Sequence, residues 1–269
     1  MAGRRDAADA PERSAAERPD SGLLGRVYVP DDRDWRLERL MTLVEPADDL
    51  LQKTLQELID GTTYFSKWSD FLALWRWVKQ RRHPADSTPV WEDLIQLDQG
   101  QTGHCVGFGW SGWGNSAPIE DRYQNSDAHA LYYQCKVIDG EPGKENGSTV
   151  RSGALAMRAR GQLAAFAFAT TLGEIDHWID TQGPVVVGTD WTNDMFDPDA
   201  NGFVHPTGSR AGGHCYLILD KVDEEDAYLF ENSWGLSWGQ QGRFKMKRAD
   251  FDSLLGNNGE ACCGLEIRP

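Results

Sequence analysis

Four side chains in two distant stretches of the chain could together carry out acyl transfer through a thiol. The first stretch, QGQTGHC, runs from Gln99 to Cys105, and the second places His214 upstream of Asn232. Cysteine attacks as its thiolate, a minor species of a free thiol at neutral pH, so such a site must lower the thiol pKa with an imidazolium and a helix N-terminus. These residue types therefore predict a nucleophile, a base, an orienting amide and an oxyanion donor.

The elements expected around these residues would hold them in place. A helix is expected to begin at Cys105, after Gly103, where the unpaired N–H groups of a first turn favour a thiolate. His214 directly precedes the apolar run CYLIL, a strand pattern, and Asn232 follows the similar run AYLFE. The Asn232 amide can then accept the second ring N–H of His214 and fix its tautomer. Gln99 is near enough in sequence to donate, with the Cys105 N–H, to an oxyanion.

The same stretches resemble the papain-like cysteine peptidases. The family's nucleophile motif Q-G-x-x-G-x-C occupies residues 99–105, an apolar strand follows the family's histidine as it follows His214, and N-S-W-G-x-x-W-G occupies residues 232–239. A further piece, P-x-x-x-D-W-R at residues 30–36, is similar to the start of many mature members. The resemblance covers roughly residues 88 to 268 plus that short piece.

The resemblance implies a fold, a chemistry and a set of site residues. The fold would be α+β, with a mainly helical half facing an antiparallel β-barrel-like half across the active-site cleft. Cys105 would form a thioester with the scissile carbonyl, His214 would act as base and acid, and Asn232 would orient the imidazole. Gln99 would line the oxyanion hole, and Trp234 would pack over the hydrogen bond between histidine and asparagine. No metal and no organic cofactor would be required.

Several positions depart from the family's common pattern. Thr102 stands where many secreted members have a disulfide cysteine, and Val106 replaces the tryptophan that often follows the nucleophile. The cysteine and histidine are 109 positions apart (214 − 105), against roughly 130 or more in the plant and lysosomal branch. These departures favour a compact, disulfide-free bacterial or phage-type branch. His104, beside the nucleophile, either faces the cleft and touches substrate or is simply exposed, and Gly213 predicts an open pocket edge.

The composition favours a cytoplasmic protein, or a virion-associated one if a phage encodes it. Residues 1–22 lack the apolar core of a signal peptide, and no later run is long enough to span a membrane, so no membrane association is expected. Five cysteines cannot all pair, and Cys262 and Cys263 are adjacent, so buried free thiols are expected. The net charge of −15 argues against nucleic acid as a ligand. The expected partner is a peptide or protein substrate.

Three regions are predicted along the chain. Residues 1–22 lack hydrophobic periodicity and are predicted to be a disordered tail. Residues 23–87 form an N-terminal segment with apolar stripes at helical spacing between 37 and 82, which predict a helical insertion. Such stripes usually pack on a core; the insertion could instead cover the cleft, because the stretch upstream of Pro30 is short for a propeptide. Residues 88–269 are the predicted peptidase domain. Within it we expect helices near 105–113, 149–160 and 172–181, the last begun by a capping box of Thr171 and Glu174. Strands are expected to begin near 185, 201, 215, 227, 243 and 264.

The sequence thus predicts a cysteine peptidase that hydrolyses peptide bonds through a Cys105 thioester. Two alternatives remain open. An amine could capture the same thioester, giving a transpeptidase or another acyltransferase, and a catalytically silent papain-like scaffold could bind a peptide. The pattern leaves open the natural substrate and subsite preference, endopeptidase or exopeptidase action, the oligomeric state and the biological role.

Overall fold

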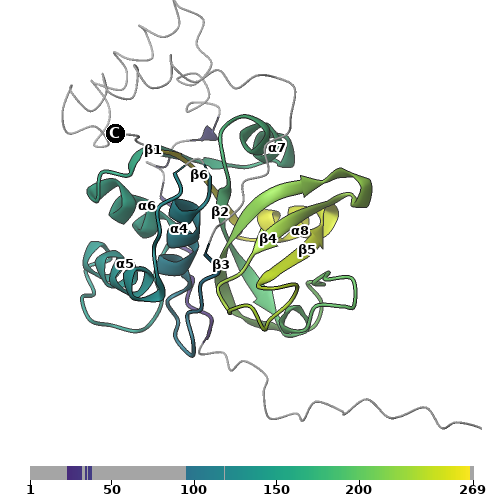
Figure 1. Cartoon of the computed structure of the whole chain (residues 1–269), viewed down its shortest axis with the longest axis horizontal. Coiled ribbons are helices and arrows are strands. Elements are labelled where there is room, and N and C mark those ends of the chain that lie inside the picture. The colour runs from purple at the N-terminus through teal and green to yellow at the C-terminus, as the bar shows by residue number, and fades with distance from the viewer. Residues whose placement is uncertain (1–22, 32–33, 35, 38–94, 118, 267–269) are drawn as a thin grey trace, which may run out of the picture.

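The structure, a computed structural model, describes residues 23–31, 34, 36–37, 95–117 and 119–266 (Figure 1). The predicted tail at 1–22 and all but the first residue of the predicted helical stretch at 37–82 lie outside these residues. The described part contains a group of helices beside a six-stranded antiparallel sheet. The predicted α+β class is confirmed.

The elements of the described part follow one another from the nucleophile helix to the last strand. They are α4 (Cys105–Asn115), α5 (Asn125–Ile138), α6 (Val150–Ala159), β1 (Leu163–Ala169), α7 (Leu172–Thr181), β2 (Val185–Thr192), η2 (Asn193–Phe196), β3 (Arg210–Val222), η3 (Asp223–Glu225), β4 (Ala227–Glu231), β5 (Arg243–Lys247), α8 (Arg248–Gly256) and β6 (Glu260–Glu266).

Helix α4 is buried along its whole length because its glycines permit close contact with neighbouring elements. A Cβ on Gly107 would lie 2.4 Å from the carbonyl oxygen of Ala128 in α5, and one on Gly109 would lie 2.9 Å from Cys215 Sγ in β3. Real Cβ atoms essentially never come so close to another heavy atom. Helix α4 therefore sits between α5 and β3, with Cys105 at its N-terminus (Figure 1).

The sheet has the strand order β1-β6-β2-β3-β4-β5, and every neighbouring pair is antiparallel. As described, it is open, with β1 and β5 at its edges. Alternate residues of β3 enter two hydrophobic cores: Tyr216 and Ile218 join the core with Phe230, and Leu217 and Leu219 join the core shared with α4 and α6. Strand β3 is thus the wall between the two cores, and it carries His214 near its start.

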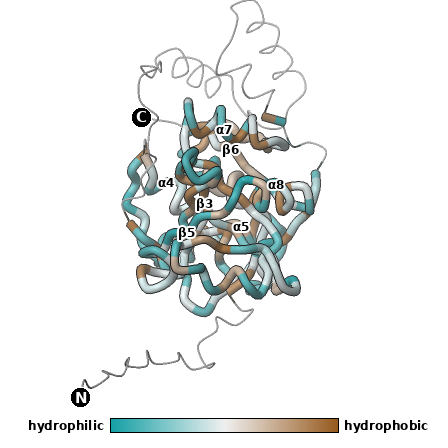
Figure 2. Tube along the Cα trace, turned by 90° about the vertical axis from the view of Figure 1, so that its right-hand side faces the viewer, coloured by the Kyte–Doolittle hydropathy of each residue, from teal (hydrophilic) through white to brown (hydrophobic). Residues whose placement is uncertain are grey.

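The outside of the molecule is polar, as expected from this arrangement of cores. Figure 2 shows hydrophilic positions concentrated on the loops around the periphery. All five cysteines are free and buried. Within the described ranges, no helix combines the length and the apolar composition that a membrane span needs.

Most of the expected elements form, and the exceptions have local causes. The capping box predicted at Thr171 and Glu174 begins α7. The strand expected at 201 is a turn instead, because Asp199 Oδ1 accepts the backbone N–H groups of Asn201 and Phe203. Besides the short 3₁₀ helices η2 and η3, three elements were not expected from the sequence: α5, β1 and α8. Strand β1 (LAAFAFA) is buried at every position, so it lacks the polar alternation that marks a half-exposed strand.

Candidate active site

His214 and Asn232 form the hydrogen-bonded pair that the sequence predicted. The distance from His214 Nε2 to Asn232 Oδ1 is 2.8 Å, and the same oxygen accepts the backbone N–H of Ser233 at 2.8 Å. Because this oxygen can only accept, Nε2 carries the proton and Nδ1 keeps its lone pair. Within the described part of the chain, His214 Nδ1 has no hydrogen-bond partner. The geometry leaves this nitrogen available as a base.

Aromatic rings enclose the imidazole of His214. Trp234 stacks on it with ring centroids 4.7 Å apart, and Trp191 meets it edge-on at 4.9 Å. His214 is completely buried. The structure therefore places Trp234 where the sequence expected it, against the histidine, and the rings exclude water from the imidazole.

Cys105 begins α4 and its side chain is also completely buried. Burial raises the pKa of the Cys105 thiol to about 11, although backbone N–H groups of Cys215, Gly25 and Val106 lie against it and lower it. Burial also lowers the pKa of His214 to about 4, partly offset by its hydrogen bond to Asn232. At neutral pH both groups are uncharged in this state, so the thiol is not activated here.

Gln99 lies beside the same site and its amide is fully engaged. Its Oε1 accepts the hydroxyl of Ser233 at 2.7 Å, which fixes the orientation of the amide. Its Nε2 donates to the carbonyl oxygens of Leu23 at 2.9 Å and Thr102 at 2.5 Å. The N–H₂ group expected to bind an oxyanion therefore already holds a backbone carbonyl of residues upstream of Pro30.

Residues 23–29, here named the N-terminal strap, run across the site. The N–H of Arg26 donates to Gly213 O at 2.9 Å, and the N–H of Val27 donates to Ser148 O at 2.7 Å. The N–H of Ser148 donates in return to the carbonyl of Gly25 at 2.8 Å. The strap thus pairs on one side with the start of β3 and on the other with the loop before α6, directly over the thiol.

Glycines on both sides make the slot that the strap fills. A Cβ on Gly25 would lie 1.8 Å from Gly103 O, and a Cβ on Gly213 would lie 2.2 Å from Arg26 O. Gly147, in the left-handed region at φ +82°, would place its Cβ 2.0 Å from Gly25 O. The pocket edge that Gly213 was predicted to open is therefore occupied by strap backbone.

Sequence reasoning missed the strap. A cover for the cleft is predicted only between 37 and 82, which lie outside the described residues apart from Leu37, and the stretch upstream of Pro30 is predicted to be too short for a propeptide. The structure corrects this point: seven residues upstream of Pro30 cover the thiol. The strap bonds through its backbone, so no periodic side-chain pattern could mark it; its one signal is Gly25, which faces a second glycine, Gly103.

His104 is buried, so the prediction of simple exposure is wrong. Its Nδ1 lies 2.7 Å from His129 Nδ1, its Nε2 contacts Glu145, and its ring stacks on Tyr132 with centroids 3.7 Å apart. Both ring nitrogens are thus engaged with α5 and the loop after it. His104 anchors the residue before the nucleophile to α5.

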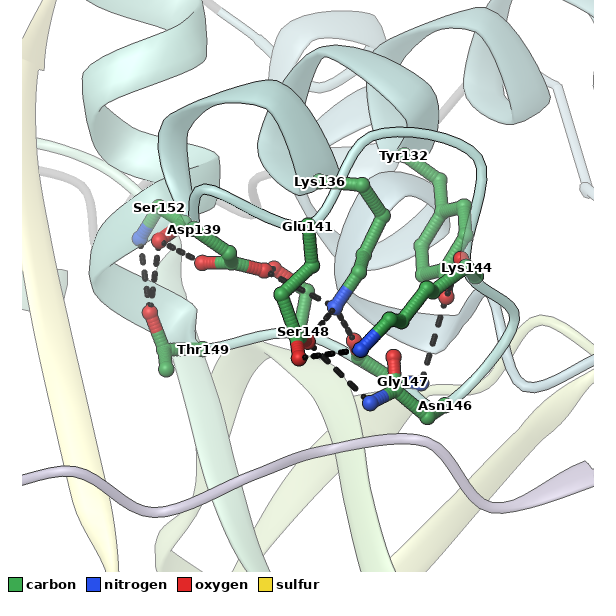
Figure 3. A network of polar contacts seen from close by, with 10 residues as sticks. All are labelled: Tyr132, Lys136, Asp139, Glu141, Lys144, Asn146, Gly147, Ser148, Thr149 and Ser152. Carbon is green, nitrogen blue, oxygen red and sulfur yellow. Dashed lines mark hydrogen bonds and ion pairs between the residues drawn. The ribbon is translucent and has the colours of Figure 1, made fainter.

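A buried lysine supports the loop that pairs with the strap (Figure 3). Lys136, in α5, is 2% exposed, and its ammonium donates to Gly147 O at 2.8 Å and Glu141 Oε2 at 2.9 Å. Ser148 Oγ donates to Asp139 Oδ2 at 2.7 Å. These bonds fix the backbone of residues 147 and 148. The sequence sign of this network is Lys136, a charged residue on the buried face of α5, and no prediction was based on it.

No metal centre is apparent in the ranges that the structure covers, where no three His, Cys, Asp or Glu side chains gather as ligands would. The site brings together one thiol, one imidazole and two carboxamides. This set matches a thiol acyl-transfer site in a closed state.

Comparisons with known proteins agree with this geometry. The family described as papain family cysteine protease matches residues 141–265, which include His214 and Asn232. The chain is 34% identical over 86 residues to cathepsin B-like cysteine proteinase 5 of Caenorhabditis elegans, covering 31% of this chain and 25% of that protein. It is 35% identical over 74 residues to cathepsin B of Dictyostelium discoideum, covering 27% and 24%. Residues 141–265 are thus similar to papain-family cysteine proteases.

The similarity extends to solved structures of papain-like fold. Xylellain, a cysteine protease from Xylella fastidiosa, superposes with a TM-score of 0.56 at 14% identity and covers 95% of this chain and 100% of that one. ProCathepsin B S9 from Trypanosoma congolense gives 0.52 at 13% identity, with 68% and 79% covered. These structures confirm the papain-like fold. The sequence matches span about a quarter of the length of the curated relatives.

Proposed function

We propose that this chain is a papain-family cysteine peptidase that hydrolyses peptide bonds through a thioester on Cys105. The observation that carries the proposal is the hydrogen bond from His214 Nε2 to Asn232 Oδ1. It fixes the tautomer in which Nδ1 is a base, on the strand whose next residue, Cys215, places its backbone against the Cys105 thiol. The family match over residues 141–265 supports the same reading.

The proposed reaction has two half-reactions, in which the Cys105 thioester is first formed and then hydrolysed. His214 Nδ1 takes the proton of the Cys105 thiol, and the thiolate attacks the carbonyl carbon of the scissile peptide bond. The oxyanion that forms is stabilised by the Cys105 N–H and the Gln99 Nε2–H group. The protonated His214 gives its proton to the leaving amine as the C–N bond breaks, leaving a thioester. His214 then deprotonates a water molecule, which attacks the thioester carbonyl. As the C–S bond breaks, the protonated His214 gives this proton to the departing Cys105 thiolate.

The described state precedes this reaction. The strap occupies the slot, its Leu23 carbonyl engages Gln99, and burial keeps thiol and imidazole neutral. Once the strap leaves, water enters and the burial effect on both pKa values falls. The thiolate–imidazolium pair can then form beside the N-terminus of α4. We therefore propose a peptidase that is latent while the strap is seated and active on a peptide or protein substrate when it is displaced.

The test is labelling with a peptidyl epoxide, followed by intact-mass analysis, peptide mapping and turnover of a peptide substrate. It is run on the full chain and on a Gly25→Ala variant, in which the strap cannot stay bound in the slot because the new Cβ would clash with Gly103 O. Cys105→Ala should abolish both label and turnover and leave thermal unfolding unchanged. Cys135→Ala, which removes another buried thiol, should keep both. Turnover by Cys105→Ala would overturn the nucleophile assignment, and slow labelling scattered over several cysteines would point to a silent scaffold.

A further inference from the structure

The side chain of Arg26 fills a pocket beside the site that the proposed reaction does not use. It is 1% exposed, and its Nη2 and Nε lie 2.7 Å and 3.0 Å from Oε2 of Glu260, whose side chain is 8% exposed. Nη2 also donates to the carbonyl oxygen of Asn258 at 2.5 Å, and the guanidinium lies 4.9 Å from the ring centroid of Tyr28. The strap thus carries a fully desolvated cation into the body of the fold.

The pocket belongs to the body of the fold rather than to the strap. Glu260 begins β6 and pairs with Gly188 of β2, which pairs in turn with Cys215 of β3. A Cβ on Gly188 would lie 2.9 Å from Arg26 Nε and 3.1 Å from Arg26 Cγ, and 2.7 Å from Val150 Cγ2. The absence of a side chain at Gly188 therefore makes the space that a long side chain enters, next to the strand residue that follows His214.

The position of the pocket relates it to the scissile bond. Gly25 places its backbone against the Cys105 thiol, and the next residue, Arg26, bonds through its N–H to the carbonyl of Gly213. The chain that passes the thiol therefore delivers the neighbouring side chain into the pocket. A substrate that replaces the strap in the slot must present one of its own side chains there, close to the bond being cut.

The charge of the pocket selects what can enter. Glu260 is paired with Arg26 in the closed state, and a substrate that replaces the strap buries the same carboxylate again. An ionised group left without its partner in the interior is strongly unfavourable. A substrate guanidinium restores the pair, whereas an apolar side chain leaves the carboxylate uncompensated. A guanidinium also fits the two N–H contacts to Glu260 Oε2 and the contact to the carbonyl oxygen of Asn258 better than the point charge of an ammonium.

We propose that this pocket is a specificity pocket for an arginine side chain of the substrate, with Glu260 as the specificity-determining residue and Arg26 as its built-in occupant. The inference rests on the proposed peptidase function. It assigns the substrate class: peptides and proteins with an arginine close to the cleaved bond.

The first experiment measures selectivity on the full chain carrying Gly25→Ala. Peptides that differ only in Arg, Lys, citrulline or Leu are compared at each position around the cleaved bond, as kcat/KM ratios. Arg should exceed its uncharged isostere citrulline on the order of a hundredfold at one position, with Lys between them. Glu260→Gln, which keeps the shape and removes the charge, should bring this ratio close to one. The control Glu225→Gln removes a carboxylate paired with Lys245 and should leave the ratio unchanged.

A second experiment reads the pocket without catalysis. Arg26→Ala empties it, and N-acetylagmatine, a small guanidinium, should raise the Tm of this variant but not that of Arg26→Ala/Glu260→Gln. A rise in the Tm of Arg26→Ala with N-acetylagmatine, in a protein that turns over no peptide, would support the pocket and count against the peptidase function. Turnover with no preference for arginine at any position would overturn the pocket's role and leave the peptidase function standing. If N-acetylagmatine did not raise the Tm of Arg26→Ala, that result would also contradict the pocket's role.

Discussion

Replacing Gly25 by alanine tests whether the strap controls access to the thiol. The new Cβ would lie 1.8 Å from the carbonyl oxygen of Gly103, a backbone atom that cannot rotate away. Separations under 3.0 Å are essentially never seen for real Cβ atoms, so the strap must move by more than 1 Å or so. The substitution changes no residue of the proposed catalytic set, so its effect reports on the strap alone.

The structure sets the size of the expected effect. Four hydrogen bonds hold the strap backbone: to Gly213, to both backbone groups of Ser148, and from Gln99. Each contributes about 1 kcal/mol net, so loss of two to four of them disfavours the seated strap by about 2 to 4 kcal/mol. This corresponds to roughly a thirtyfold to thousandfold rise in the population of the open state, because about 1.4 kcal/mol is a factor of ten.

The assay is the rate of Cys105 alkylation by iodoacetamide under native conditions, followed by intact mass and peptide mapping. Labelling requires opening, so its rate follows the open population. Gly25→Ala should label at least about thirtyfold faster than the wild type. Gly173→Ala is the matched control, because a Cβ there meets no atom within 4 Å. Equal rates for the wild type and Gly25→Ala, within about twofold, would refute the reasoning.

Three further outcomes follow from the same geometry. Gln99→Ala in the open enzyme should lower kcat by about a hundredfold if its amide binds the oxyanion, and an unchanged kcat would remove it from that role. Because closure raises the pKa of Cys105 to about 11, deprotonation of the thiol favours opening, so the labelling rate of the wild type should keep rising to higher pH than that of Gly25→Ala; identical pH profiles would contradict this. Hydrogen bonds from Lys136 first, and then from Asn146 and Lys144, lower the pKa of Glu141 from 4.5 to about 2. Their stabilisation is therefore present above about pH 4.5 and lost as pH falls through about 2. Lys136→Met should lower Tm by several degrees at pH 7, and the difference should shrink between those pH values; a constant difference would argue against the charge interaction.

The sequence predicted those parts of the fold that side-chain patterns encode. The capping box at Thr171 and the apolar runs around His214 and Asn232 each specify a local structure, because their side chains either cap a helix or enter a core. Strand β1 escaped prediction since both of its faces are buried, which removes the alternation on which the prediction depends. The turn at 199–203 escaped because one carboxylate redirects an otherwise strand-like segment.

The sequence predicted which residues gather at the candidate site, but it did not predict that the thiol is covered. Motif spacing predicted that Gln99, Cys105, His214 and Asn232 lie at one site, and their roles in acyl transfer stay predictions. That the thiol is covered depends on backbone bonds from the strap and on glycines that admit it, and neither gives a periodic signal. The partnership between Arg26 and Glu260 joins residues 234 positions apart. No local pattern in a single sequence connects such a pair.

The strap belongs to the same polypeptide as the slot it occupies, so its binding is a unimolecular equilibrium. A tethered segment acts at an effective concentration on the order of millimolar, whatever the concentration of the protein. Dilution therefore cannot release it, and a free peptide must compete against this local excess. A single backbone cut between the strap and the fold would make binding of the strap bimolecular: the strap would become a separate ligand, and dilution alone would then uncover the thiol.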